Sequence, residues 1–425
     1  MTIIVFTLAL LAPMALGLPI AFSLFLCGVA LMLTQGQFDA TLVSQKMIEG
    51  TDSFPLLAIP FFLLAGELMN AGGISKRIVN FALAWVGHLR GGLGYVAIFA
   101  SVVMAAISGS AAADTAALGA LLIPMMRRAN YDIPRASGLM AAGGVIAPVI
   151  PPSIGMIIFG VIGNVSIGKL FLAGIVPGIL MGLSLVVAWA WVARRDKVEV
   201  LPRQGFAKRM RAGIDGIWAL TMPIGVIGGL KFGLFTPTEA GVAACVYAFV
   251  LGLLVYRDLR LRDCLPLLVA AAKSTAVVVF LIASALVSAY LIATSDVPAQ
   301  VADLLEPFTG NKTVLMAVIM ILVVVIGTAL DMGPTIMILT PVFMPIVKEA
   351  GIDPVYFGVL FIMNNAIGLI TPPVGIVLNV ICGVSKITMK QLMEGLWPFL
   401  WAELAVMFLL VAFPSIVLVP LKWLT

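Results

Sequence analysis

The 425-residue chain has few charged residues, one histidine and four cysteines, and each scarcity excludes a class of protein. Only 11% of its residues are charged, against about 25% in ordinary globular domains, whereas 62% are hydrophobic. This composition excludes a soluble enzyme, because the apolar surface could not be covered in water, and it excludes a disordered chain. The cysteines are isolated and form no pattern typical of a metal site or a disulfide framework. No Walker A pattern occurs, so the chain is not expected to hydrolyse ATP.

The hydrophobic residues form long runs, and the mean hydropathy is +1.16. Since a transmembrane helix takes about 20 apolar residues, the runs predict roughly ten to twelve membrane spans, some of them partial. The net charge of +5 comes from short basic clusters between these runs. That is the positive-inside pattern of a multi-pass membrane protein, not a nucleic-acid-binding surface. The most polar segment, residues 194–215, is expected to be a cytoplasmic loop.

The two halves of the chain repeat one pattern. A shift of 221 residues places Pro124 on Pro345 and Pro151-Pro152 on Pro372-Pro373. Basic clusters stand at opposite ends of corresponding apolar runs, so we expect the two copies to be inverted relative to each other. The predicted units are residues 1–213 and residues 214–425. Each unit would hold scaffold helices plus a hairpin and a broken helix, at about residues 91–165 and about residues 313–385.

Each half contains a turn of small polar residues followed by a Pro-Pro break. Ser108-Gly109-Ser110 precedes Pro151-Pro152-Ser153, and residues 327–335 precede Thr371-Pro372-Pro373. Since unpaired backbone groups cannot face hydrocarbon, such breaks must be buried in protein or line a cavity. Their carbonyl, hydroxyl, amide and carboxylate oxygens suit a hard cation such as sodium, and adjacent helix N-termini favour an anionic substrate. Each motif alone also has a structural explanation, which is close helix packing for Ser-Gly-Ser and a kink for Pro-Pro.

Asp114 and Asp331 are carboxylates within these interrupted segments. Charged groups are costly inside a membrane, which makes both residues functional candidates. Asp114 could alternatively cap the helix that follows it. A remoter alternative pairs His88 with Ser110 as an intramembrane serine protease, although nothing in the sequence brings the two together.

At these breaks the sequence resembles the large membrane subunit of tripartite ATP-independent periplasmic (TRAP) transporters, and the resemblance covers essentially the whole chain. The stretches that carry it are residues 53–73 (SFPLLAIPFFLLAGELMNAGG), 107–115 (ISGSAAADT), 146–159 (IAPVIPPSIGMIIF), 233–241 (GLFTPTEAG) and 368–375 (GLITPPVG). Together they are highly specific, whereas any one alone would be weak.

The resemblance implies an all-α, multi-pass protein of the bacterial inner membrane, which is a transporter and not an enzyme. Its fold would be of the elevator type, with two re-entrant hairpins and two broken helices in inverted repeats. It would use sodium as the coupling ion and no cofactor. Its expected partners are a small four-helix membrane subunit, a periplasmic substrate-binding protein, an organic-acid substrate and the lipid bilayer, with no nucleic acid.

The resemblance also implies one sodium site at each break, without identifying the ligand oxygens. The candidate sodium-site residues are Ser108, Gly109, Ser110, Asp114, Pro151, Gly327, Thr328, Asp331, Thr335, Gly368, Thr371 and Pro372. The candidate substrate-binding residues are Ser108, Ser153, Asn364, Asn365 and Thr371. We therefore expect sodium-coupled symport of an organic acid, with a sialic or other sugar acid favoured, delivered by a binding protein. The alternative is a stand-alone ion-coupled organic-anion carrier or antiporter that needs no binding protein.

Overall fold

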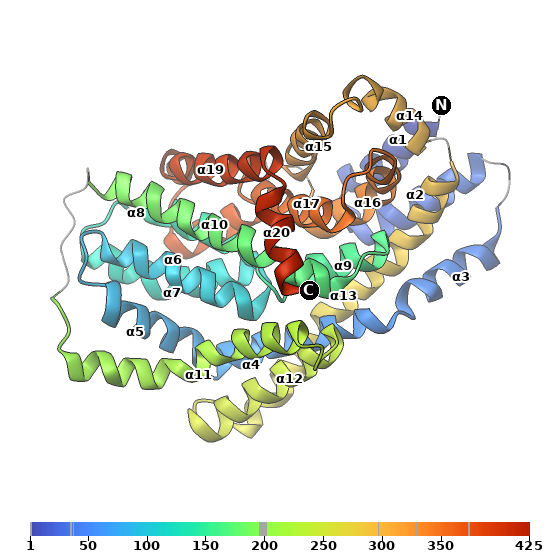
Figure 1. Ribbon diagram of the computed structural model, residues 1–425. Coiled ribbons are helices and arrows are strands. Elements are labelled where there is room, and N and C mark those ends of the chain that lie inside the picture. Colours follow the sequence, from blue (N-terminus) through green and yellow to red (C-terminus); the bar gives the residue numbers. More distant parts are fainter. Residues whose placement is uncertain are drawn as a thin grey trace.

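The computed structural model describes residues 2–34, 36, 38–194, 202–295, 297–328, 330–372 and 375–425. The described part of the chain is all-helical, with twenty α-helices, three short 3-10 or π segments and no β-strand (Figure 1). The expected all-α architecture is thus confirmed. Part of the predicted cytoplasmic loop (residues 195–201) and Pro373 of the second break lie outside the described residues.

The helices divide between the two halves of the chain. The first half contains α1 (Thr2–Ala15), α2 (Ile20–Thr34), α3 (Ala40–Thr51), η1 (Phe54–Leu57), α4 (Ala58–Ala71), α5 (Ile74–Val86), α6 (Gly92–Ser108), α7 (Ala111–Arg128), α8 (Ile133–Gly144), α9 (Ile154–Gly163) and α10 (Ile167–Ala193). The second half contains α11 (Phe206–Lys231), α12 (Pro237–Val250), η2 (Leu251–Val255), α13 (Leu261–Thr294), α14 (Val297–Leu305), η3 (Glu306–Phe308), α15 (Lys312–Gly327), α16 (Met332–Glu349), α17 (Pro354–Gly368), α18 (Ile376–Ser385), α19 (Met389–Ala412) and α20 (Ser415–Leu424).

Six helical segments in the described chain are long and apolar enough to cross a membrane singly. They are Phe54–Ala71, Ile167–Ala193, Phe206–Lys231, Pro237–Val255, Leu261–Thr294 and Met389–Ala412. Several of the other apolar helices are shorter, between 10 and 17 residues, and at 1.5 Å per residue the shortest would cover only about half of the ~30 Å hydrocarbon core. Among these shorter helices is α9, which follows the first Pro-Pro break.

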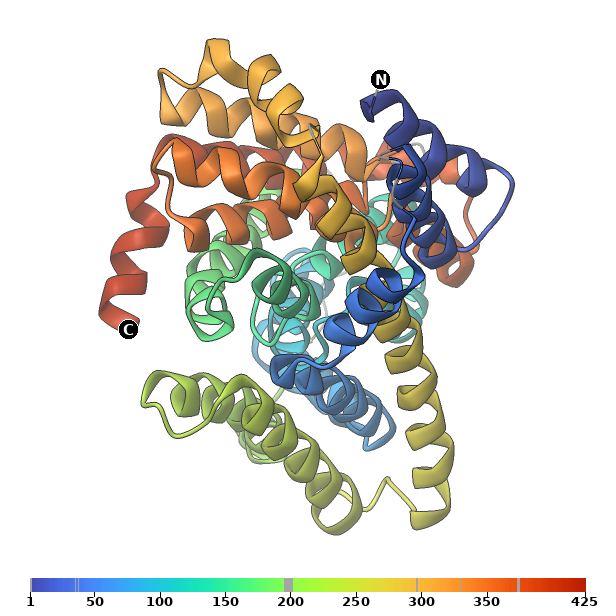
Figure 2. The same cartoon turned by 90° about the vertical axis from the view of Figure 1, so that its right-hand side faces the viewer.

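One group of helices is built around α2, α4, α12 and α13. α2 packs along α13, and α4 packs along α12. Small residues bring these helices close together, because a Cβ added at Gly28 of α2 would lie 2.9 Å from the Val287 side chain of α13. Ser288 Oγ donates a hydrogen bond across the same contact to the carbonyl oxygen of Leu24. In Figure 2, α11 and α12 lie together at the lower edge of the molecule.

A second group contains α6 to α10 and α15 to α19. In this group, helices from the first half of the chain pack against helices from the second half. α7 packs against α18, and α16 packs against α9. Gly119 of α7 faces Val384 of α18, where an added Cβ would lie 3.2 Å away, and Gly163 of α9 faces Thr340 of α16 at 3.3 Å. The shift of 221 residues carries Gly119 to Thr340 and Val384 to Gly163, so the two contacts are counterparts.

The helix bounds recur at the same spacing. α7 covers residues 111–128 and α16 covers residues 332–349, so their first and last residues differ by 221. α6 and α15 agree to within two residues under this shift, as do α9 and α18. The recurrence supports the division into inverted repeats at residues 213 and 214, which stays a prediction.

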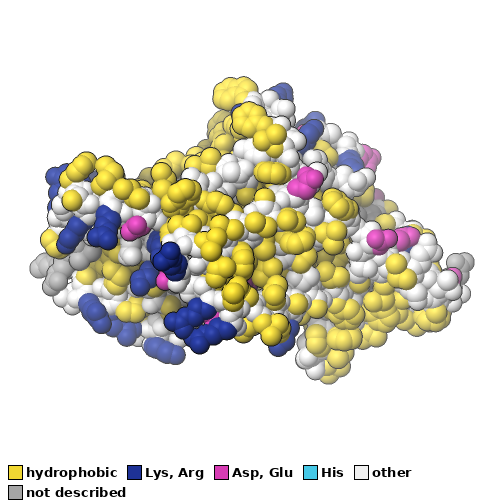
Figure 3. Space-filling view, turned by 90° about the horizontal axis from the view of Figure 1, so that it is seen from below, with side chains coloured by type: hydrophobic (Ala, Val, Ile, Leu, Met, Phe, Trp, Pro, Cys, Tyr) yellow, Lys and Arg dark blue, Asp and Glu magenta, His cyan; other side chains and the backbone are white. Residues whose placement is uncertain are grey.

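The outer surface is largely apolar, as expected for a chain solvated by lipid. Seen from below, hydrophobic side chains cover most of the face, and most of its Lys and Arg side chains gather in the left half of the view (Figure 3). Exposed apolar side chains are spread over many helices, for example Leu8 of α1, Ile224 of α11 and Val325 of α15. In lipid these exposed side chains carry no hydrophobic penalty.

Candidate functional site

The first turn lies between α6, which ends at Ser108, and α7, which Ser110 caps. The backbone of Ser110 is extended, and its Oγ accepts a hydrogen bond from Ala113 N at 3.4 Å. Gly109 has a left-handed φ of 62°, which glycine adopts without steric cost. A Cβ added at Gly109 would lie 2.6 Å from the carbonyl oxygen of Pro152. The turn therefore lies directly against the first Pro-Pro break.

Asp114 lies in the first turn of α7 and is 1% exposed. Ser108 Oγ donates a hydrogen bond to Asp114 Oδ1 at 2.5 Å, and Ser110 N donates to Ser108 Oγ at 3.1 Å. The second carboxylate oxygen, Oδ2, has no hydrogen-bond partner within the described residues. Leaving such an oxygen buried and unpaired is costly, so this site has an unused capacity for a cation or a proton.

Two further buried hydroxyl groups, one on α6 and one on α7, were not predicted from the sequence. Thr115 and Ser101 are fully or nearly fully buried, and neither hydroxyl has a hydrogen-bond partner in the described chain. Both face the end of α8, because Cβ atoms added at Gly144 and Gly143 would collide with Thr115 Oγ1 and Ser101 Oγ. One signal was available from the sequence, the position of Thr115 next to Asp114, whereas only the fold brings Ser101 against the end of α8.

The first break itself is buried and uses its polar groups internally. Pro151, Pro152 and Ser153 are all buried. Ser153 Oγ accepts a hydrogen bond from Met156 N at 3.2 Å, which caps α9, and it donates to the carbonyl oxygen of Pro148 at 2.5 Å. The hydroxyl thus stabilises the N-terminus of α9, and a role for Ser153 in substrate binding stays a prediction.

The second turn lies against the second break in the corresponding way. A Cβ added at Gly368, at the end of α17, would lie 3.0 Å from the backbone of Gly327, at the end of α15. Asp331 caps α16, because its Oδ1 accepts a hydrogen bond from Met332 N at 2.7 Å. The carbonyl oxygen of Asp331 also accepts a hydrogen bond from Thr335 Oγ1 at 2.8 Å. The two acids therefore differ, since Asp331 holds a helix end, whereas Asp114 lies inside α7.

Two other predicted residues, Thr328 of the second turn and Thr371 of the second break, each bond to the helix that precedes them. Thr328 Oγ1 donates to the carbonyl oxygen of Val325 and Thr371 Oγ1 to that of Ile367, at 2.7 and 2.8 Å. Pro372 is exposed. These contacts leave open whether the three residues bind an ion, which stays a prediction.

Asn364 and Asn365 are fully or nearly fully buried in α17. Asn364 Nδ2 donates to the carbonyl oxygen of Met320 in α15, and Asn365 Nδ2 donates to that of Phe361. Both amide oxygens lack a partner within the described residues. An amide oxygen held in this way is available as an acceptor or as an ion ligand, so the pair remains a candidate for binding.

The first break and the second turn pack against each other at Gly155 and Met332. A Cβ added at Gly155 of α9, two residues after Ser153, would lie 3.1 Å from the sulfur of Met332, the first residue of α16. The first break and the second turn are therefore neighbours, although they lie far apart in sequence. In the described part of the chain, no three His, Cys, Asp or Glu side chains gather. An ion site here would depend on hydroxyl, carbonyl and amide oxygens around a single carboxylate.

Two alternatives from the sequence do not fit this geometry. Ser110, not Asp114, caps α7. His88 precedes the N-terminus of α6 and Ser110 follows its C-terminus, so the 17-residue helix separates them by about 25 Å. The protease pairing is therefore wrong.

Glu403 is a buried acid that the sequence analysis did not single out. It lies in α19 with no exposed surface, and neither carboxyl oxygen has a hydrogen-bond partner in the described chain. A lone acid inside an apolar run was a signal available from the sequence.

Comparison with known proteins agrees with the resemblance found in the sequence. The family model of the tripartite ATP-independent periplasmic transporter, DctM component, matches residues 7–416. The chain is 51% identical to the 2,3-diketo-L-gulonate TRAP transporter large permease protein of Escherichia coli K12, covering 100% of both chains. It is 38% identical to the sialic acid TRAP transporter large permease protein of Vibrio cholerae, over 95% of this chain and 94% of that one. The corresponding C4-dicarboxylate protein of Pseudomonas aeruginosa is 36% identical, with the same coverage.

The fold also has a counterpart among solved structures. The crystal structure of the Alcanivorax borkumensis YdaH transporter matches with a TM-score of 0.64, over 89% of this chain and 90% of that one. The two sequences are 15% identical, so the likeness concerns the fold alone.

Proposed function

Because the chain belongs to the DctM component family of tripartite ATP-independent periplasmic transporters, we propose that it carries an organic acid across the membrane in symport with sodium. The family and the apolar helices make the chain a multi-pass protein of the bacterial inner membrane. The family is one of transporter components, not of enzymes.

The observation that carries the sodium proposal is the buried carboxylate of Asp114, held by Ser108 while its Oδ2 has no partner within the described residues. A sodium ion beside it would supply the missing charge and take up the unpaired oxygen. Ser108, Asp114 and Thr115 are the side chains that we propose to hold one ion at the first break. At the second break we propose Asn365, Thr371 and the backbone near Gly327 and Gly368 for another.

Sodium also favours the substrate electrostatically. A carboxylate entering the membrane interior without a counter-charge would meet a large cost. A cation at each break would offset that charge, and the N-termini of α9 and α16, which meet at Gly155 and Met332, would add favourable partial charge.

The names of the relatives support a sugar acid as the substrate class. The E. coli relative at 51% identity is named for 2,3-diketo-L-gulonate, and the V. cholerae relative at 38% is named for sialic acid. The P. aeruginosa relative, named for C4-dicarboxylates, is 36% identical. We therefore propose a sugar acid ahead of a dicarboxylate.

We further propose that the chain works with a small four-helix membrane subunit and a periplasmic substrate-binding protein, as the tripartite family name suggests. In this proposal the group containing α6 to α10 and α15 to α19 moves as one unit against α2, α4, α12 and α13, in the manner of an elevator. The packing of α7 on α18 and of α16 on α9 supports joint movement of both breaks.

The test is uptake of labelled 2,3-diketogulonate and sialic acid into proteoliposomes containing this chain and the small subunit. An inward sodium gradient is compared with choline, and the binding protein is added or omitted. Uptake that requires both sodium and the binding protein is the expected result. Uptake with sodium but without the binding protein would favour the stand-alone carrier, and uptake that is equal in choline would refute sodium coupling.

A further inference from the structure

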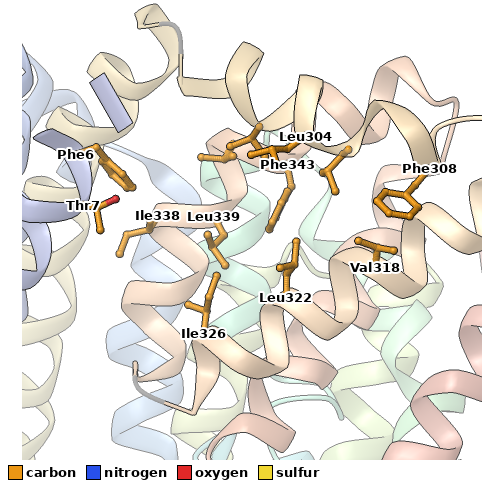
Figure 4. Close-up of a pocket in the computed structure, with 13 residues that line it drawn as sticks. Phe6, Thr7, Leu304, Phe308, Val318, Leu322, Ile326, Ile338, Leu339 and Phe343 are labelled. Carbon is orange, nitrogen blue, oxygen red and sulfur yellow. The ribbon is translucent and has the colours of Figure 1, made fainter. Parts of the chain in front are cut away.

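A cavity of about 420 Å³ lies between the second hairpin and the helices outside it (Figure 4). Its walls come from α1, from α14 with the adjoining segment to Phe308, and from α15 and α16. The side chains that define its interior are Phe6, Val318, Leu322, Ile338, Leu339 and Phe343. Thr7 supplies the one polar side chain among those that line it.

The cavity is continuous with the apolar outer surface. Leu304, Leu322 and Phe308 line it and are 71%, 39% and 38% exposed. Ile321 and Val325 lie on the outward face of α15 beside them and are also exposed. In an inner-membrane protein, this surface faces lipid.

We propose that the cavity binds one acyl chain of a phospholipid. An anionic sugar acid is excluded, because almost nothing in the lining can pair with its charge. An acyl chain is flexible and apolar, reaches the opening from the bilayer, and gains contact with side chains from four helices.

The bound chain lies where it can stabilise the second hairpin. Ile326 lines the cavity and directly precedes Gly327, which contacts the second break. Ile338 lies one turn after Thr335, which is bonded to Asp331. The acyl chain therefore bridges α1 and α14 to both arms of the hairpin. This inference depends on the membrane location of the chain and not on the proposed substrate or on sodium.

The first experiment uses the unaltered protein in nanodiscs that contain a phosphatidylethanolamine with a diazirine in one acyl chain. After illumination, labelled residues are mapped by mass spectrometry. We expect labelling at residues 301–308, 318–326 and 338–343 to exceed that on the exposed face of α11, around Ile217 and Ile224. Equal labelling per exposed side chain on both surfaces would overturn the proposal.

The second experiment fills the cavity. Val342, 5% exposed, lines it, and Val406, 8% exposed, lines a separate apolar groove between α10 and α19. Val342→Phe should lower labelling at the cavity about tenfold, because each methylene displaced from apolar surroundings weakens binding severalfold. Val406→Phe should leave that labelling unchanged. An equal effect of the two variants, or none from Val342→Phe in a protein that elutes as a single species, would refute the assignment.

Discussion

Replacing Gly109 with alanine tests whether the first turn must touch the first break. Two costs are expected. Forcing a residue with a Cβ into the left-handed region costs about 1–2 kcal/mol. In addition, the new Cβ would lie 2.6 Å from Pro152 O, whereas ordinary contact begins at 3.4 Å, so turn and break must separate by about 0.8 Å. The atoms that the new Cβ would meet belong to the backbone of Pro152 and Ile154, so no flexible side chain can move aside.

Gly233 provides the matched control. Its φ is 67°, close to the 62° of Gly109, but a Cβ added there would meet no atom of the described residues within 4 Å. Gly233→Ala should therefore cost only the energy of a left-handed backbone at a residue with a Cβ, without the steric clash expected at Gly109. Both variants should show a lower apparent unfolding temperature in detergent.

The two variants should differ in transport. A displacement of about 1 Å in a positioned site can reduce activity by about a hundredfold, so we expect Gly109→Ala to lose at least tenfold in sodium-driven uptake per folded molecule. Gly233→Ala should retain most of it. Uptake is measured in proteoliposomes with protein amounts equalised by size-exclusion chromatography. Equal uptake by the two variants would refute the idea that contact between Gly109 and Pro152 positions the site.

Three other changes probe the site and its surroundings. Ser108→Ala removes the hydrogen bond to Asp114, and hydrogen bonds to charged groups contribute about 1.5–3 kcal/mol. The sodium concentration for half-maximal uptake should therefore rise about tenfold or more. An unchanged sodium titration would contradict the role of Ser108. Gly368→Ala should impair uptake because its Cβ would press on Gly327, whereas Gly383→Ala, with open space around it, should not. Glu403→Met should raise the apparent unfolding temperature, because the two carboxyl oxygens of Glu403 are buried without a partner among the described residues, which costs about 1–3 kcal/mol. A lower unfolding temperature in differential scanning fluorimetry would show that Glu403 has a stabilising partner.

The sequence determined the class of the protein. Apolar runs with few charges require lipid as the solvent, because no soluble fold could bury them. Backbone polarity then allows helices or a closed barrel, and runs near the ~20 residues of a spanning helix indicate helices. The five stretches that include the motif around Ser108 and the paired prolines at residues 151–152 and 372–373 together indicated the family. The recurrence at 221 residues is likewise present in the sequence itself.

Only the tertiary structure decided which polar groups remain unpaired. From the sequence, both acids were functional candidates and Asp114 was the one offered as a helix cap, but packing buries Asp114 beside Ser108 and makes Asp331 the cap. Ser101 and Thr115 come to lie against the end of α8 because α6 and α7 pack on that helix. The cavity proposed to bind an acyl chain is formed by helices from both halves of the chain, α1 with α14, α15 and α16. Such features arise from contacts between distant residues, and no local pattern encodes them, because a side chain's partners are set by the approach of other helices.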